Sequence, residues 1–343
     1  MSVNKGKVVV TGAGGYIGTS LVPYLLESGY EVRAIDRFFF GENWIKNHPD
    51  LEIVKADIRN LEDSHFKGSF ACIDLAAISN DPSGEKYVTE TLDINFSGRV
   101  NNANLSKKNG LHRYILPSSC SNYGKIPADQ IADEDFKLNP LSNYSTANAK
   151  AEQGILPLAD ENFCVTVLRQ GTVYGYSPKM RFDLVINGMT YGAWSKGILP
   201  LMRPGTQRRP ALHIKDAIRA QLMMLETDSN KINGEIFNVG GENNNYSIND
   251  LAEIFQNIFK NLEIDWYGSD DDRSYFVSFE KIKSIGFSNK FTAEDGIVEL
   301  VAKLESGEAI KSDETITLAW YEKIEEWKNK IKSMEIDGKL LKR

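Results

Sequence analysis

The first half of the chain alternates short runs of β-branched residues with amphipathic helical patterns. A strand, a helix and another strand, repeated in this way, predict parallel strands joined by right-handed crossovers. The expected fold is therefore α/β, with a doubly wound parallel sheet. The predicted strands are Lys7–Thr11, Glu31–Ile35, Leu51–Val54, Phe70–Leu75, Tyr114–Pro117 and Cys164–Arg169, and the helices between them include Ile17–Glu27 and Val88–Asn109.

After about residue 176 the pattern becomes mainly helical. Residues 177–205 indicate a helix and a loop, and Trp320, Ile324, Trp327 and Ile331 recur at helical spacing, which predicts one buried stripe. We expect residues 1–176, with about 210–242, to form one domain, and residues 177–209 with 243–343 to form a smaller lobe. The further predicted elements are helices Leu212–Glu226, Ile248–Phe259 and Ala293–Leu304, and the strand Glu235–Val239.

Composition and charge narrow the class of protein. The 343 residues carry 40 basic and 47 acidic side chains, a net charge of −7, which argues against binding to nucleic acid or to an anionic membrane surface. No apolar run is long enough for a membrane span, and the start of the chain lacks the features of a secretory signal. Few, distant cysteines and scattered histidines fit a cytoplasmic protein without a metal site.

A glycine-rich turn between the first strand and the first helix is the first sign of function. Gly12 permits the tight turn, Gly15 lets the backbone approach a pyrophosphate, and Gly18 lets the helix pack close to the sheet. The amides of Tyr16 and Ile17, at the helix start, would face the anion. A glycine-rich turn without any ligand is the alternative.

An acidic residue follows at the distance that a ribose-binding carboxylate requires. Asp36 ends the second strand, where it can accept hydrogen bonds from the two adenosine ribose hydroxyls and repel a 2′-phosphate. This favours NAD over NADP in a Rossmann-like domain. The neighbouring Arg37 leaves NADP open, because an arginine can hold that phosphate.

The glycine spacing resembles that of the extended short-chain dehydrogenase/reductase superfamily, in its NAD-dependent epimerase/dehydratase branch, whose members modify nucleotide sugars. Further segments extend the resemblance over most of the chain, among them Val173-Tyr174-Gly175 and Leu212-His213-Ile214-Lys215-Asp216. The resemblance implies that Asp57 and Ile58 meet the adenine, that Leu75, Ala76 and Ala77 lie under the cofactor, and that Asn95 has a supporting role.

The same resemblance supplies the catalytic candidates. Ser119 matches the family's sugar-binding hydroxyl and Tyr144 its catalytic tyrosine, which exchanges a proton with the sugar oxygen while hydride leaves or joins the carbon. The family motif continues Tyr-x-x-x-Lys, but this chain has Asn148 at the lysine position, and Lys150 points about 200° around the helix. Asn148 can still bond the nicotinamide ribose.

The missing lysine charge has an energetic consequence. At ~6 Å and an effective dielectric of ~20, a unit charge is worth about 3 kcal/mol. The expected result is slow chemistry at neutral pH, an alkaline optimum, or a reaction that demands less of the tyrosine.

The carboxyl-terminal lobe is expected to bind a nucleotide-diphosphate sugar. Arg209 and Arg273 match family arginines whose guanidinium groups suit phosphate oxygens, and Lys179 and Arg181 are further candidates. Pairing of two chains through the tyrosine-bearing helix and the one before it would give a homodimer. Small side chains at Ala147, Ala149 and Ala151 favour close helix approach there.

The reaction itself stays open at this point. Ser119-Cys120-Ser121 stands where 4,6-dehydratases of the family carry Thr-Asp-Glu, so that elimination ranks low. An epimerase or dehydrogenase acting at a hexose carbon, C4, through a keto intermediate is the leading interpretation. A ketosugar reductase using NAD(P)H and a catalytically weak nucleotide-sugar binder are the alternatives. Cys120 is either an acid/base or inert packing.

Overall fold

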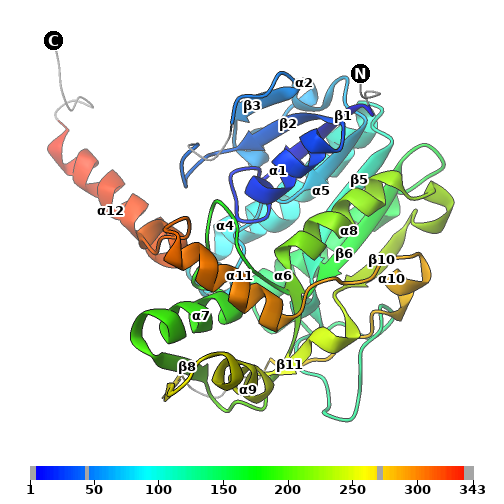
Figure 1. Ribbon diagram of the computed structural model, residues 1–343. Coiled ribbons are helices and arrows are strands. Elements are labelled where there is room, and N and C mark those ends of the chain that lie inside the picture. Colours follow the sequence, from blue (N-terminus) through cyan, green and yellow to red (C-terminus); the bar gives the residue numbers. More distant parts are fainter. Residues whose placement is uncertain (1–4, 43–45, 269–272, 336–343) are drawn as a thin grey trace.

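The computed structural model describes residues 5–42, 46–268 and 273–335, and its centre is a sheet of seven parallel strands (Figure 1). The strand order is β3-β2-β1-β4-β5-β6-β10, so the direction of winding reverses between β1 and β4. All six strand pairs are parallel, which confirms the doubly wound, Rossmann-like sheet. The strands are β1 (Lys7–Thr11), β2 (Glu31–Asp36), β3 (Leu51–Lys55), β4 (Ala71–Asp74), β5 (Arg113–Ser119), β6 (Cys164–Gln170) and β10 (Glu235–Val239).

Helices cover both faces of this sheet, because the central strands β1, β4 and β6 are buried at nearly every position and so on both faces. Val8 and Val10 of β1 pack toward α1 (Gly18–Glu27) and α8 (Ile214–Glu226). Val9, between them, packs in the opposite core with α2 (Asp63–Phe66), α5 (Arg99–Lys108) and α6 (Asn143–Ile155).

The predicted helix from Val88 to Asn109 is helical without a break as far as Lys108, but its middle is a π-helical segment. It consists of α4 (Val88–Leu92), a π-helical segment (Asp93–Gly98) and α5, preceded by the short α3 (Asp81–Lys86). Asn95 in the wide π-helical segment is fully buried, with its amide on the backbone of Ile78. Such widened turns are frequent near functional sites.

The smaller lobe is mainly helical, as expected, but it also contains two small sheets. α7 (Val185–Lys196), α9 (Ile248–Ile258) and α11 (Ala293–Glu305) share one apolar core. The prediction of only helix and loop over residues 177–205 missed β8, because that strand is completed by a distant partner. The strands of these two sheets are β7 (Thr172–Tyr174), β8 (Ile198–Met202), β9 (Arg208–His213), β11 (Asn245–Ser247) and β12 (Glu263–Tyr267). β7 and most of β9 belong by sequence to the residues expected in the first domain, so they join its chain to the lobe. The remaining short helix of the lobe is α10 (Glu280–Ser284).

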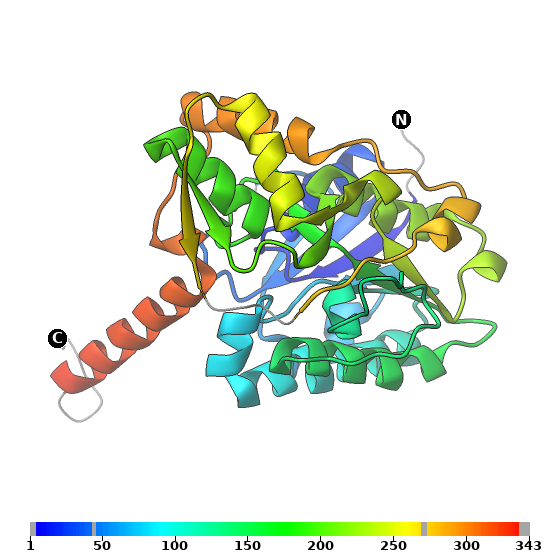
Figure 2. The ribbon, with the colours of Figure 1, turned by 90° about the horizontal axis from the view of Figure 1, so that it is seen from below.

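The last described helix, α12 (Thr317–Met334), projects from the body of the molecule (Figure 2). Trp320 in its first turn is buried and donates from Nε1 to the carbonyl of Phe39 at 2.7 Å. Trp327 and Ile331 are 44% and 43% exposed, so the predicted buried stripe is wrong beyond the first turn, where the helix has left the surface that covers Trp320. Across the described residues, every helix is too short or too polar to span a bilayer.

Candidate active site

The glycine-rich turn lies at the carboxyl end of β1, beside the switch point of the sheet. Gly12 has a φ of +65°, and a Cβ there would lie 2.6 Å from the amide nitrogen of Ala76. A Cβ at Gly18 would lie 2.4 Å from the carbonyl oxygen of Gly12. At Gly15 an added Cβ would meet only that same carbonyl, at 3.1 Å, so this side of the turn is open to a ligand. The expected roles of the three glycines therefore fit the geometry.

The carboxylate of Asp36 lies directly across from this turn. It accepts hydrogen bonds from the amides of Gly14 at 2.9 Å and Phe38 at 2.7 Å, which fix its position. Burial raises the pKa of Asp36. Arg37 instead pairs with Asp57 at 3.0 Å, so a nearby carboxylate already occupies the guanidinium that could have held a 2′-phosphate.

The loop after β4 completes the wall around the glycine turn. The amide of Ala76 donates to Oγ1 of Thr11 at 3.1 Å, and Leu75 and Ala77 flank it. Asn95 accepts from the amide of Ile78 at 2.8 Å and donates to its carbonyl at 2.9 Å. Asn95 thus braces this loop.

The short turn after β3 carries two further residues predicted to contact the cofactor, Asp57 and Ile58. Asp57 caps it by accepting from the amide of Arg59, and Ile58 is buried beside the π-helical segment at Gly98. The turn places both predicted adenine contacts at the same edge as Asp36, because β2 and β3 are parallel neighbours.

Ser119 and Tyr144 come from the next elements along this edge. Ser119 ends β5, and its Oγ accepts from the amide of Ser121 at 3.1 Å and from the hydroxyl of that serine at 2.9 Å. Tyr144 lies in the first turn of α6, whose start is capped by Ser142. It is half-buried, and α3 packs so closely that a Cβ at Gly84 would lie 3.1 Å from its Cβ.

A buried ion pair holds α6 against the sheet behind these residues. Glu152 and Arg169 pair at 2.8 Å, both nearly inaccessible to solvent, and Glu152 also accepts from Ser118 and Asn122. Since removing one member of a buried pair is strongly destabilising, this network fixes the register of α6.

Asn148 follows Tyr144 by one turn and is buried. Its Oδ1 accepts from the guanidinium of Arg99 at 3.2 Å, a contact that the sequence did not suggest. Its Nδ2 has no hydrogen-bond partner among the described residues. Lys150 is exposed, with its ammonium 6.0 Å from the ring centre of Phe96, so it lies on a different side of α6 from the buried Asn148.

Cys120 is buried next to Ser119. Its thiol donates to the carbonyl of Arg169 at 3.2 Å, and burial raises the pKa of the thiol. This environment favours the inert alternative over an acid/base role.

Two of the four basic residues predicted to bind substrate lie together in the carboxyl-terminal lobe. Arg209 lies over the ring of Tyr275, 5.1 Å from its centre, and donates to the carbonyl of Arg273. Arg273 forms an ion pair with Asp81 at the start of α3. Tyr275, which sequence reasoning missed, is buried and interacts electrostatically with both arginines and with Tyr144, and burial raises its pKa to about 12.

Arg181 does not join them. It binds Asp183 through two nitrogens, at 3.0 and 2.8 Å, and Ser79 through the third, at 2.9 Å. Every terminal nitrogen therefore has a partner, and the residue clamps the loop after β7 to the loop after β4. The guanidinium also interacts electrostatically with Tyr144.

Lys179 lies beside the glycine turn, apart from Arg209 and Arg273. Its backbone amide donates to Oγ1 of Thr19 on α1, and its ammonium lies 3.7 Å from the ring centre of Phe40. The side chain is 6% exposed and forms no ion pair with a carboxylate of the described residues. Burial, reinforced by the charge of Arg181, lowers its pKa to about 7.

The alanines expected to mediate dimerisation lie inside the chain. Ala147, Ala149 and Ala151 are 0%, 6% and 0% exposed, so they are covered by other parts of the same chain and offer no outer surface. The small side chains on α6 were expected to allow close contact with a second chain, but they are covered within the same molecule.

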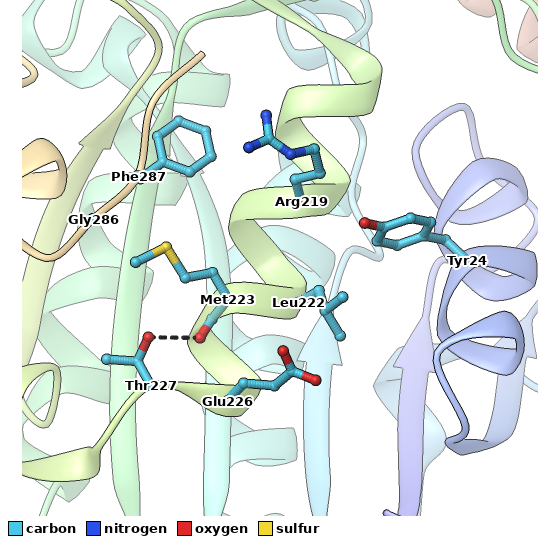
Figure 3. Close-up of a pocket in the computed structure, with 8 residues that line it drawn as sticks. All are labelled: Tyr24, Arg219, Leu222, Met223, Glu226, Thr227, Gly286 and Phe287. Carbon is cyan, nitrogen blue, oxygen red and sulfur yellow. Dashed lines mark hydrogen bonds between the residues drawn. The ribbon is translucent and has the colours of Figure 1, made fainter. Parts of the chain in front are cut away.

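Among the described residues no group of His, Cys, Asp and Glu side chains could hold a metal ion. A surface hollow elsewhere on the molecule lies against the outer side of α8 (Figure 3), where Glu226 pairs with Lys5 and Arg219 pairs with Asp216. It belongs to the opposite face of the sheet from α6 and contributes nothing to this site. Its lining residues are Tyr24, Arg219, Leu222, Met223, Glu226, Thr227, Gly286 and Phe287.

Comparison with known proteins agrees with this geometry. The UDP-glucuronate 4-epimerase of Thermodesulfobacterium geofontis is 26% identical over 332 residues, covering 90% of this chain and 99% of that protein. A UDP-N-acetyl-alpha-D-glucosaminuronate decarboxylase of Bacillus cytotoxicus is 24% identical over 334 residues, covering 94% and 99%.

Among solved structures, the UDP-glucuronic acid 4-epimerase of Bacillus cereus, in complex with UDP-glucuronic acid and NAD, superposes with a TM-score of 0.79. It is 25% identical and covers 88% of this chain and 99% of that one. The family model described as NAD dependent epimerase/dehydratase matches residues 8–240. The chain therefore belongs to the NAD dependent epimerase/dehydratase family, the extended short-chain dehydrogenase/reductase enzymes.

Proposed function

We propose that this protein is an NAD-dependent nucleotide-sugar epimerase or dehydrogenase that acts at a hexose carbon, C4, through a keto intermediate. The observation that carries the proposal is the convergence of Tyr144, Ser119 and the open glycine turn on one edge of the sheet. A phenol and a hydroxyl at this place can hold one sugar oxygen, which is what oxidation of a carbinol requires.

The residues present fit NAD. The side of the turn at Gly15 is open. Among the described residues, the buried Nδ2 of Asn148 has no acceptor and the buried ammonium of Lys179 forms no ion pair. The turn, Asn148 and Lys179 would each meet a hydroxyl or phosphate oxygen of the dinucleotide. When bound, NAD supplies a hydride acceptor. Asp36 would hold the adenosine ribose and repel a 2′-phosphate, and the guanidinium of Arg37 is already engaged by Asp57.

Lys179 is reassigned in this proposal from substrate to cofactor. Its segment is bonded to the glycine turn, since Ser177 donates to the carbonyl of Tyr16 at 2.7 Å. An ammonium buried without an acidic partner is costly, and an anionic pyrophosphate at the turn would compensate its charge.

The substrate is a nucleotide-diphosphate sugar held by the smaller lobe. Arg209 and Arg273 offer guanidinium groups for phosphate oxygens, with Tyr275 packed beneath Arg209. We assign residues 177–209 and 243–343 to this role, apart from Lys179, and residues 1–176 with 210–242 to the cofactor. The relatives above, named for reactions on UDP-sugars, support a uridine nucleotide.

In the reaction Tyr144 takes the proton from the sugar hydroxyl and later returns it, while Ser119 holds the same oxygen. Ser121 is engaged with Ser119 through two hydrogen bonds and orients that hydroxyl. Arg181 holds the loop after β4 in place through Ser79.

The test is incubation of the purified protein with a panel of UDP- and dTDP-sugars and NAD, followed by NMR of the products. An epimer without net NADH supports the epimerase, and a ketosugar with stoichiometric NADH supports the dehydrogenase. Binding of the sugars without any product, or full turnover by the Tyr144→Phe variant, overturns the proposal.

We also propose a cytoplasmic homodimer paired through α5 and α6, as the resemblance implies. All three cysteines are buried and unpaired, which fits a reducing compartment. Light scattering coupled to gel filtration measures the assembly, and a monomer at micromolar concentration would contradict the dimer.

A further inference from the structure

The guanidinium of Arg99 is a buried cation at the tip of Asn148. Arg99 is 3% exposed and donates from NH1 to Oδ1 of Asn148 at 3.2 Å and from Nε to the carbonyl of Ala76 at 3.1 Å. Both acceptors are neutral. Within the described residues no carboxylate lies within ion-pair distance of this guanidinium.

The arrangement fixes the direction of the asparagine amide. A guanidinium only donates hydrogen bonds, so the oxygen of Asn148 must face Arg99 and its Nδ2 must face away. That nitrogen is buried and has no partner in the described part of the chain. A buried donor without an acceptor costs free energy, and a ribose hydroxyl oxygen would satisfy it.

The other cations near Tyr144 are already neutralised. Arg181, from the loop after β7, is bound to Asp183 by two hydrogen bonds, and Arg273 pairs with Asp81 at the start of α3. Tyr275, which interacts electrostatically with Tyr144, is a neutral phenol, and the exposed carboxylate of Glu85 on α3 binds the backbone and side chain of Asn143, next to the tyrosine.

One buried carboxylate lies on the far side of Arg99. Asp74, at the end of β4, accepts from Thr11, Asn102 and the hydroxyl of Tyr114, which also donates to the backbone carbonyl of Arg99 at 3.1 Å. Burial holds the pKa of Tyr114 well above its usual range, so it stays a neutral donor between them. Asp74 is thus linked through Tyr114 to the backbone of Arg99, and it does not pair with the guanidinium.

We propose that Arg99 and Asn148 together replace one long cationic side chain beneath Tyr144. Asn148 presents its Nδ2 to a ribose hydroxyl of the cofactor, and Arg99 is a positioning residue that orients Asn148 and supplies the positive charge that favours the phenolate form of Tyr144. This inference rests on the proposed function for its catalytic meaning, but the charge and the amide orientation can be measured without turnover.

The first experiment titrates the free protein. The 13Cζ NMR signal of Tyr144, assigned by its loss in Tyr144→Phe, reports the transition from phenol to phenolate. In Arg99→Met the midpoint should move upward by about one pH unit, because a buried charge has been removed. In the control Arg113→Met, which removes a guanidinium bonded to the carbonyl of Met224 at the opposite end of β5, it should not move.

The second experiment tests the exchange of roles. Asn148→Lys alone puts two cations in contact and should lower the melting temperature. The double variant Arg99→Met/Asn148→Lys removes this repulsion. Its Tyr144 midpoint should return to within roughly 0.3 pH units of the parent, which is the precision of the method. NAD affinity should fall about tenfold in Asn148→Ala, which removes the donor, and recover in the double variant.

An unchanged Tyr144 midpoint in Arg99→Met, or a double variant no closer to the parent than Arg99→Met, overturns the inference. If Arg99→Met does not fold, the double variant is compared with Asn148→Lys instead. The double variant, which carries one cation in place of two, should then melt at the higher temperature of the two. Turnover by Tyr144→Phe would contradict the proposed function and leave these titrations as an independent result.

Discussion

Replacing Lys179 by methionine should stabilise the free protein and weaken its binding of NAD. The ammonium is buried against Phe40, has no carboxylate partner among the described residues and lies beside the glycine turn. Methionine keeps much of the apolar stem and removes the charge. This one substitution therefore separates two effects of the buried cation, its destabilisation of the folded protein and its contribution to NAD binding.

The stability change follows from the pKa of Lys179, which burial lowers from 10.5 to about 7. Below pH 7 both the folded and the unfolded chain carry the proton, and the folded state bears the full cost of the charge. Between pH 7 and 10.5 the folded state loses its proton first, so this cost falls as the pH rises. At 1.36 kcal/mol per pKa unit, the cost at neutral pH is up to about 4 kcal/mol.

The binding change has the opposite sign. A unit charge ~4 Å from a phosphate, at an effective dielectric of ~20, is worth about 4 kcal/mol, part of which is spent on protonating and desolvating the lysine. We expect NAD to bind ten- to a hundredfold more weakly to Lys179→Met. In the parent, affinity should fall as the pH rises above about 7, because the anion requires the protonated form.

Melting curves and calorimetric NAD titrations at pH 6.5 and 9 measure both effects. Without NAD, Lys179→Met should melt several degrees above the parent at pH 6.5, and the gap should narrow by pH 9. Lys107→Met is the control, because Lys107 pairs with Asp160 on the surface. A variant that melts lower than the parent at pH 6.5, or one that keeps the parent's NAD affinity within twofold, refutes the reasoning.

Four further substitutions separate the parts of the site. Tyr144→Phe should lower kcat by a factor of about 10²–10⁴ while the nucleotide sugar still binds, which isothermal titration checks. Arg209→Gln should raise KM about tenfold with little change in kcat, and an equal loss in kcat would contradict a ground-state phosphate contact. Asp36→Asn should weaken NAD binding about tenfold yet leave NADP binding no weaker, as competition titrations show. Cys120→Ser should keep kcat within about twofold, since the buried thiol is not an acid/base.

The main sheet could be predicted from the sequence because its signals are local. Buried parallel strands read as short apolar runs, so the boundaries of β1 and β10 agree with the prediction to the residue. β8 and β12 could not be found in this way. They form a two-stranded sheet between segments more than sixty residues apart, and β12 is exposed along its length.

The same distinction, between local signals and contacts of distant segments, applies to the residues of the candidate site. The glycines and Asp36 could be proposed from a local pattern, and Ser119 and Tyr144 from motifs that resemble those of the family. The partners of Arg181 and the surroundings of Lys179 could not, because a basic residue in a sequence looks the same whether a carboxylate, an aromatic ring or water surrounds it.

Asn148 shows most clearly what a local pattern leaves out. The motif predicts a lysine at this position, and its absence predicts a site without a nearby positive charge. The structure brings Arg99, 49 residues earlier in the chain, into contact with the asparagine because α5 and α6 lie side by side on the same face of the sheet. The charge that a motif assigns to one residue can be supplied by a neighbouring helix, so a departure from the motif at one position predicts loss of activity only when the residues packed against it are known.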